Sequence, residues 1–256
     1  KLLRTGGRPD LMESRRRNLS ATAFVAFSGL VALAVYAQAQ EQTPGDWLAK
    51  MTRAVETMNY EGTVIRVKGS AVEALKVVHV VTDGVVREKI VTQEGNGLEI
   101  IRNGNEVHCI LPDKKSVLVD EWNEQSSLFS TLPSSDIEFG TQYDVLFDGK
   151  ARVAGRKAVI LAVKPHDEYR FGHRIWLDTK TGFPLKTMLI GDDGGEIEQV
   201  KFADITLGQE ILASALQPTH STDGFRWRSE ERRVGEEGCC RGAGGEGWGG
   251  GGGGGG

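Results

Sequence analysis

Histidine is the residue type in this sequence that first suggests chemistry, because an imidazole can ligate a metal or act as a base near neutral pH. The chain contains five histidines. His166 and His173 have no Cys or His partner at the spacing of a zinc site. His79 lies within an apolar run, which favours a hydrogen-bonded structural role over a catalytic one. We therefore expect neither a metal nor a cofactor.

Other catalytic patterns are also absent from the sequence. It contains no G-x-S-x-G elbow, no H-E-x-x-H pair and no phosphate-binding G-x-x-x-x-G-K loop. The carboxylates of Asp113 and Asp178 follow strand-like runs and are typical of turns. The sequence predicts a protein that acts by binding and is not an enzyme. A hydrolase stays an alternative, because acid, base and nucleophile can come together from distant positions.

The net charge and the cysteine content further limit the partners and covalent links that we expect. The formal net charge is −4, and no basic face is evident that could release counterions from a nucleic acid, so no nucleic-acid partner is expected. Cys109 lies in an apolar run and is predicted to be a buried structural thiol. Because the other cysteines are Cys239 and Cys240, near the end of the chain, no disulfide is predicted.

The N-terminal region has the pattern of a secretory signal. Residues 12–39 contain a basic stretch at 15–17, an apolar stretch at 21–36 and an A-x-A cleavage site that ends at Ala39. A membrane anchor is the alternative, but an apolar stretch of about sixteen residues is short of the roughly 20 that span a bilayer. We expect cleavage after Ala39, a periplasmic mature protein, and non-native upstream sequence at residues 1–11.

The C-terminal region differs from the rest of the chain. Residues 228–256 end in a run of glycines, which offers no side chains to pack and loses much backbone entropy on ordering. We interpret this segment as an artefactual, disordered tail that resembles translated adapter sequence. A natural flexible tail is the alternative.

Between these ends, a short helix precedes a long β-rich region. Residues 46–58 place Trp47, Met51 and Ala54 on one face at helical spacing. Strand-like runs with a period of two then follow at 62–68, 75–81, 85–91, 98–102, 107–111, 116–119, 143–147, 158–164, 169–177, 185–190 and 199–205. Turn residues such as Asp83-Gly84 separate them, which predicts an antiparallel meander of hairpins.

A sheet of about eleven strands accumulates twist and curls strongly. The predicted fold class is therefore mainly β, a strongly curved antiparallel sheet that forms an unclosed β-barrel. The helix and the apolar insert at 127–132 are expected to act as a lid. The concave apolar side could be either a packed core or an apolar pocket.

Strand alternation and the insert supply candidate residues for such a pocket. The candidate ligand-binding residues are Met51, Ile65, Val67, Val77, Ile100, Leu128, Phe129, Leu132, Phe171 and Ile175. Polar groups at the rim are expected from His79, Arg102 and Arg174. Each apolar candidate, taken singly, is equally compatible with an ordinary core position.

Several of the segments form a recognisable set when taken in order. They are Asn59-Tyr60-Glu61-Gly62-Thr63, the run at 100–107, the run at 169–178 with Tyr-Arg-x-Gly-His-Arg-x-Trp-Leu-Asp, and Thr181-Gly182-Phe183-Pro184-Leu185-Lys186. With a cleavable signal before them, they resemble the MucB/RseB family of periplasmic sigma-E regulators. The resemblance covers about residues 45–215.

This resemblance implies a fold and a function. The expected fold is like that of the lipoprotein carriers LolA and LolB, with an apolar cavity at residues 40–215. The expected partner is the periplasmic domain of a membrane-bound anti-sigma factor of the MucA/RseA type, which the protein shields from regulated proteolysis. Lipid or lipopolysaccharide is the expected signal. Residues 216–227 correspond to a linker to a second, smaller C-terminal domain of the family. A LolA/LolB-like periplasmic lipid or lipoprotein carrier is the alternative function.

Overall fold

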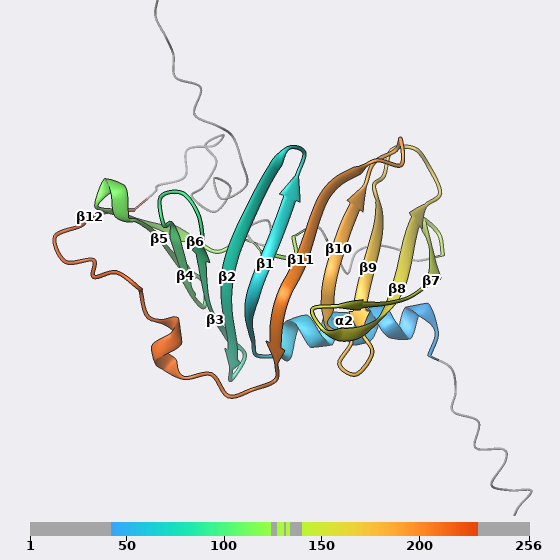
Figure 1. The fold of residues 1–256 in the computed structure, drawn as a ribbon, viewed down its shortest axis with the longest axis horizontal. Helices are drawn as coiled ribbons and strands as arrows, with labels where there is room; N and C mark the ends of the chain where they lie inside the picture. Colours follow the sequence, from blue (N-terminus) through green and yellow to red (C-terminus); the bar gives the residue numbers. More distant parts are fainter. Residues whose placement is uncertain (1–41, 124–126, 131, 134–139, 230–256) are drawn as a thin grey trace, which may run out of the picture. The chain divides into compact units, whose positions relative to one another are not determined.

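One antiparallel sheet organises the structure, a computed structural model that describes residues 42–123, 127–130, 132–133 and 140–229 (Figure 1). Twelve strands lie in the order β12-β6-β5-β4-β3-β2-β1-β11-β10-β9-β8-β7. Their bounds are β1 Tyr60–Lys68, β2 Ala71–Thr82, β3 Val85–Thr92, β4 Glu99–Asn103, β5 Glu106–Leu111, β6 Ser116–Glu121, β7 Tyr143–Val153, β8 Arg156–Pro165, β9 Gly172–Asp178, β10 Pro184–Ile190, β11 Glu196–Leu207 and β12 Arg226–Ser229. The sheet is strongly curved and its two edge strands do not pair with each other, so the fold class is the unclosed antiparallel sheet that the sequence predicted.

The sheet consists of two meanders that meet at one seam. Strands β1–β6 pair with their sequence neighbours, and so do β7–β11. The seam is the antiparallel pairing of β1 with β11, which runs from Tyr60↔Leu207 to Lys68↔Glu198 with a bulge between Thr63 and Val64. Strand β12 pairs with β6 in parallel.

Hairpin connections follow from local turn chemistry. Asp83 and Gly84, between β2 and β3, both have positive φ angles, 51° and 77°. Two-residue turns of this kind match the right-handed twist of the strands that they join. The β7–β8 turn has Ala154 and Gly155 at φ 46° and 73°, and Ala154 therefore adopts a conformation that alanine rarely visits.

Helix α2, Pro44–Thr57, begins with a complete capping box. The Thr43 hydroxyl accepts a hydrogen bond from the Asp46 amide, and the Asp46 carboxylate accepts one from the Thr43 amide at 2.8 Å. Pro44 stands where its missing N–H would have no helical partner. The helix ends at Thr57, one residue before the predicted end, because Met58 is already extended.

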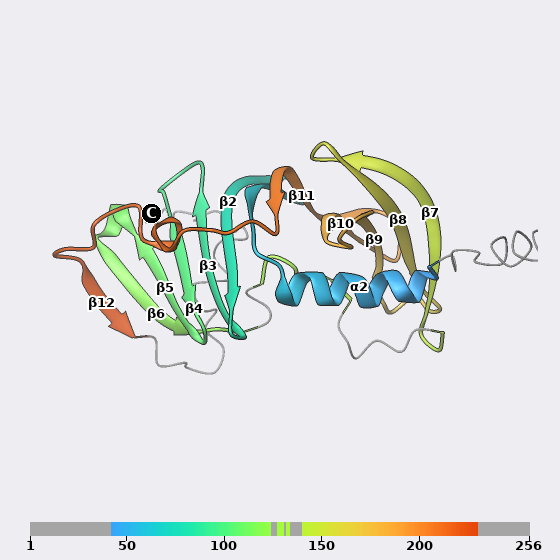
Figure 2. The ribbon, with the colours of Figure 1, turned by 90° about the horizontal axis from the view of Figure 1, so that it is seen from below.

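Helix α2 packs on one face of the sheet, named here the inner face (Figure 2). Its Trp47, Leu48 and Met51 join a buried cluster with β7, β8 and β9. Its Ala54 joins a second buried cluster, which includes Tyr60, Val64 and Val77. The opposite side of the sheet is named the outer face.

The limits of some strands differ from those predicted from the sequence. Strand β7 continues to Val153, past the predicted end at 147, because a register shift between Phe147 and Lys150 lets the strand bend and go on pairing with β8. The run predicted at 169–177 enters the sheet only at Gly172. The expected signal peptide at 12–39, the upstream residues 1–11, most of the expected tail at 228–256 and part of the apolar insert lie outside the described residues.

Cys109 contradicts one expectation from the sequence. Cys109 is fully buried, as expected, but it is disulfide-bonded, so the expectation that no disulfide forms is wrong. Of the helices in the described ranges, none has the length and apolar character needed to cross a membrane.

Gly62 is expected to be the residue of the seam that tolerates substitution least. A Cβ built there would lie 2.3 Å from the Asp204 carbonyl oxygen, so Gly62→Ala must push β1 and β11 apart. We expect a loss of about 1–3 kcal/mol in the free energy of unfolding, measured by urea denaturation. Gly45→Ala in α2 is the control, because its nearest atom would be 3.8 Å away and alanine favours helices. Equal stability of the two variants would contradict this account of the seam.

Candidate functional site

Four aromatic rings fill the centre of the inner face. They are Tyr60 of β1, Phe202 of β11, Phe183 before β10 and Phe129 of the insert, and each is at most 8% exposed. Ring centroids lie 4.8 Å apart for Tyr60 and Phe183, and 5.6 Å apart for Phe129 and Phe183. Tilted and edge-on arrangements at these distances are favourable packing geometries. The structure therefore has a packed aromatic core at this position, named the aromatic cluster.

A buried polar group adjoins the aromatic cluster. The His79 ring stacks on Tyr60 at 4.7 Å with an interplanar angle of 11°. His79 Nδ1 lies 3.1 Å from Glu88 Oε1, and the Tyr60 hydroxyl donates to the same oxygen at 3.4 Å. Burial, and then the charge of Glu88, raise the pKa of Tyr60 well above its usual value, so the phenol stays protonated as a hydrogen-bond donor.

Two further features mark this polar group, one at His79 and one at Arg102. The second ring nitrogen of His79, Nε2, is buried and has no hydrogen-bond partner among the described residues, and an unsatisfied buried nitrogen is costly in an apolar environment. Arg102 lies near Glu88 and stacks on Trp122, with its Cζ 3.6 Å from the ring centroid. Burial lowers the pKa of Arg102, against the opposing effect of Glu88. The polar group thus combines a partly buried cation with a ring nitrogen that has no partner among the described residues.

The structure brings most of the predicted cavity residues together on the inner face, in two neighbouring clusters. Met51 and Ile175 belong to the cluster under the first turns of α2. Val77, Leu128 and Phe129 belong to the cluster that contains the aromatic rings, with Ile100 packed against it and Leu132 packed against both clusters.

The remaining predicted residues lie elsewhere. Ile65 and Val67 alternate with buried Val64, so they lie on the outer face and are only half-buried. The sequence favoured the wrong face because Ile65 and Val67 are apolar, whereas the inner positions that alternate with them at this end of β1 include Arg66 and Lys68. Phe171 is 51% exposed, since it precedes the start of β9 and has no strand neighbour to cover it.

The predicted rim residues are also separated. His79 is buried inside the polar group, and Arg102 is partly buried beside it. Arg174 alternates with Ile175 and so lies on the outer face, where its Nε is 2.5 Å from Asp148 Oδ2 and its Cζ is 5.4 Å from the Trp176 ring.

Sequence reasoning missed Tyr60, Phe183 and Glu88. Tyr60 and Phe183 stand within the segments 59–63 and 181–186 that carry the family resemblance, and an aromatic residue within two positions of a glycine was a usable signal there. Glu88 gave no such signal, because a charged residue in a strand usually faces solvent. Only the pairing of His79 with Glu88 across β2 and β3 shows that it is buried.

Asp178 confirms the turn role that the sequence predicted for it. Its Oδ1 accepts hydrogen bonds from the Thr181 amide at 2.8 Å and the Lys180 amide at 3.0 Å, and its Oδ2 accepts one from Arg156 Nε at 2.8 Å. Burial by itself would raise the pKa of Asp178, but the hydrogen bonds from Arg156 and Thr181 outweigh it and lower the pKa. This network holds Phe183 against the aromatic cluster.

A polar groove of about 630 Å³ lies at the opposite end of β8 and β9. Its lining includes Lys164, His166, Arg170, His173 and Arg174, of which the last three come from the distinctive run at 169–178. The cations have acidic partners: Arg170 pairs with Asp167, and His166 Nε2 lies 3.0 Å from Asp144 Oδ1. No three His, Cys, Asp or Glu side chains in the described ranges gather as a metal site.

Fold and site together define an open, strongly curved antiparallel sheet with one helix across a packed inner face. The chain belongs to the MucB/RseB family, because residues 43–220 match the model of the MucB/RseB N-terminal domain.

Three comparisons illustrate the relationship. The chain is 30% identical over 179 residues to the sigma factor AlgU regulatory protein MucB of Pseudomonas aeruginosa, covering 70% of this chain and 55% of that protein. It is 25% identical over 170 residues to the sigma-E factor regulatory protein RseB of Escherichia coli K12, covering 66% of this chain and 54% of that protein. The complex structure of P. aeruginosa MucA/MucB matches with a TM-score of 0.55 and 30% identity, covering 68% of this chain and 60% of that chain. The chain thus spans about half the length of these curated relatives.

Phe129 and Phe171 offer a matched test of the packed core, because the sequence placed both in one cavity. Phe129→Ala is expected to lower the free energy of unfolding by about 3–5 kcal/mol, since it leaves a void among three other rings. Phe171→Ala removes a half-exposed ring and is expected to change it by about 0.5 kcal/mol or less. Urea unfolding of both variants measures this, and a small loss for Phe129→Ala would show that its ring is not packed in solution.

Asp144→Asn is expected to lower the pKa of His166, measured by NMR titration of the imidazole. The hydrogen bond to Asp144 is the largest cause that raises this pKa, followed by the hydrogen bond to the Thr141 carbonyl. Because the folded-state pKa is raised, the interaction stabilises the fold fully below the unfolded pKa and is lost as pH rises through the folded value. Asp148→Asn is the control, since Asp148 pairs with Arg174, and an unchanged pKa in Asp144→Asn would refute the assignment.

Proposed function

We propose that this chain is the sensor-side domain of a periplasmic regulator that binds the periplasmic domain of a membrane-bound anti-sigma factor. In this proposal, binding shields the anti-sigma factor from regulated proteolysis, and a lipid-type signal relieves that protection. The observation that carries the proposal is the family match over residues 43–220, together with relatives whose names describe sigma-factor regulation. The MucA/MucB complex supports the class of partner.

The proposed mechanism is binding without catalysis. The polar group of His79, Glu88 and Tyr60 has the composition of an acid–base pair, but all three side chains are buried and satisfy one another except at His79 Nε2. No nucleophile adjoins them among the side chains with described contacts. The predicted export signal at 12–39 would place the mature domain in the periplasm, the compartment that also contains the periplasmic domain of the proposed anti-sigma partner.

Lipid sensing is proposed to act through the inner face. Its residues are mostly apolar, and they are covered by α2 and by the insert that carries Leu128 and Phe129, not by further strands. An acyl chain could enter only if this cover shifts, because the aromatic cluster fills the space beneath it. Entry of a signal lipid would therefore be coupled to the position of the cover, and this coupling would lower the affinity for the partner.

Calorimetry can test the regulator proposal with the chain as given and with a version extended to the length of its relatives. Each is titrated with the periplasmic segment of the anti-sigma factor, with and without a fluorescent lauric acid probe. We expect binding of the segment, and a several-fold weaker affinity when the probe is bound. Phe129→Ala should raise probe uptake because it opens an apolar void, whereas Phe171→Ala should not.

The same experiment separates the two candidate functions. A LolA-like carrier is favoured by the same apolar inner face, and it would take up the probe while showing no affinity for the anti-sigma segment. Failure of both versions to bind the segment would refute the regulator. Binding of the segment with an affinity that the probe leaves unchanged would refute the lipid-sensing part alone.

A further inference from the structure

The chain after β11 crosses back over the other half of the sheet. Residues 209–225, named the strap, leave β11 and pass across β2 and β3 towards β12, and they include a short 3-10 helix, Ala213–Leu216 (Figures 1 and 2). The strap lies on the outer face, because it contacts Lys89 and Glu99, which alternate with the inner-face residues Ile90 and Ile100.

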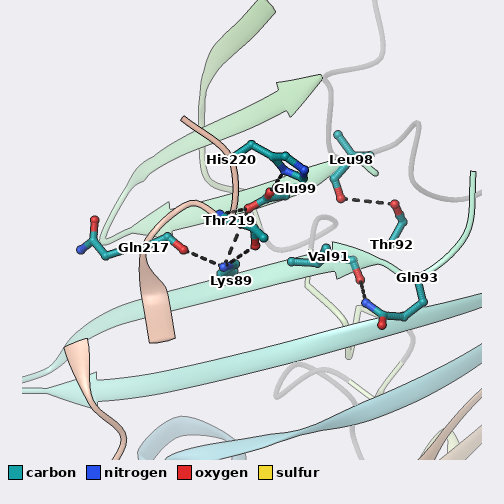
Figure 3. Close-up of polar contacts among 9 residues, drawn as sticks. All are labelled: Lys89, Val91, Thr92, Gln93, Leu98, Glu99, Gln217, Thr219 and His220. Atoms are coloured by element: carbon teal, nitrogen blue, oxygen red, sulfur yellow. Dashed lines mark hydrogen bonds and ion pairs between the residues drawn. The ribbon is translucent and has the colours of Figure 1, made fainter. Parts of the chain in front are cut away.

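Two side chains on adjacent strands hold the strap at one point (Figure 3). Lys89 Nζ donates hydrogen bonds to the Gln217 carbonyl oxygen at 2.6 Å and to Thr219 Oγ1 at 2.9 Å. Glu99 Oε2 accepts a hydrogen bond from the Thr219 amide at 2.8 Å, and Oε1 lies 2.7 Å from His220 Nδ1. Lys89 and Glu99 are themselves 3.8 Å apart. They therefore bind a carbonyl and an amide of the main chain, two residues apart, as an extended peptide presents them.

Glu99 depends on the strap for most of its hydrogen bonds. Its side chain is 0% exposed, and a buried carboxylate is strongly destabilising unless it is paired and hydrogen-bonded. Thr219 and His220, which lie about 120 positions further along the chain, supply two of its three close polar partners in the part of the chain that the structure describes. If the strap undocked, Lys89 would be the one remaining close polar partner of Glu99 among the described side chains.

Packing contributes little to holding the strap. Leu212 is 73% exposed, and the residues of the 3-10 helix include none that is buried. A groove of about 450 Å³ lies between the strap and the sheet, lined by Ile101 and His108 on one side and by Leu216 and Pro218 on the other. The contact with Lys89 and Glu99 is therefore the main attachment of residues 211–220.

We propose that Lys89 and Glu99 form a clamp for an extended peptide main chain, and that the strap is a releasable segment which occupies this clamp through residues 217–220. Opening the clamp frees the strap and uncovers the groove above Ile101 and His108. Beyond His220 the chain rejoins the sheet as β12, which pairs with β6, so the docked clamp sets the path of the strap between β11 and β12. The strap thus has a docked and a free state, and the buried carboxylate of Glu99 sets the balance between them.

Hydrogen exchange on the full chain tests the clamp. Glu99→Gln keeps the size of the side chain but removes its charge and one acceptor oxygen, so the protection of the Thr219 amide is expected to fall at least tenfold. Glu94→Gln is the matched control, because Glu94 is an exposed carboxylate on the connection between the same two strands, and it should leave the strap unchanged. Cleavage by thermolysin near Leu212 and Leu216 should accelerate to a similar degree in Glu99→Gln.

A second variant changes the strap and leaves the sheet intact. His220→Ala removes a side chain that is 53% exposed, and it is expected to raise exchange at residues 217–220 in the same direction as Glu99→Gln. Faster exchange confined to the strap, with unchanged protection of the amides in β3 and β4, supports the proposal. Exchange equal to that of the unmodified chain in both variants, or an equal loss of protection across β3 and β4, would overturn it.

Discussion

The pairing of β1 with β11 is the constraint on which the rest of the structure depends. Each meander, β1–β6 and β7–β11, forms from neighbours in sequence, but only this seam makes them one continuous sheet. The strands approach so closely at Gly62 that no side chain fits against the Asp204 carbonyl. The seam also places Tyr60 beside Phe202, with centroids 6.0 Å apart, and so it creates the aromatic cluster. Because these contacts join positions more than a hundred residues apart, the loop-closure entropy is offset only when the whole inner face packs.

Buried charges show how the two faces of this sheet differ. On the inner face, Glu88 is satisfied by Tyr60 and His79, which come from the two preceding strands. On the outer face, Glu99 is satisfied by a segment that arrives after the entire second meander. The first arrangement is rigid, because its partners are themselves buried in the sheet. The second joins a fixed strand to a surface segment, which makes it suited to a change between two states.

The inner face is covered by elements that are not strands of the sheet. A curved sheet of this kind needs a cover on its concave side, and α2 with the insert provides one without adding strands. A helix attached by side-chain packing can shift without breaking ladder hydrogen bonds, whereas a strand cannot. A binding protein that must sense a second molecule benefits from such a cover. This is the physical reason that the family fold and the proposed regulatory role are compatible.

The sequence by itself determined the class of fold, the limits of most strands and the position of α2. Alternation of period two, turn pairs such as Asp83-Gly84 and the helical spacing of Trp47, Met51 and Ala54 act locally, and local signals survive in a single sequence. The motif at 169–178 was equally informative about the family, because a long run of specified residues seldom occurs by chance. Most of the predicted inner-face residues, such as Val77 and Ile175, also followed from alternation.

Only the tertiary structure decided which apolar side of β1 is the inner one, because Val64 and Ile65 carry nearly the same hydrophobic signal. It likewise decided that Phe171 is exposed, that Arg174 faces away from His79, and that Glu88 and Glu99 are buried. Each of these depends on a partner far along the chain, and a pairing between distant segments leaves no periodic trace in either one. Local chemistry therefore determined the helix and the strands. The register between distant strands, together with the contact of the strap, determined which of their side chains are buried.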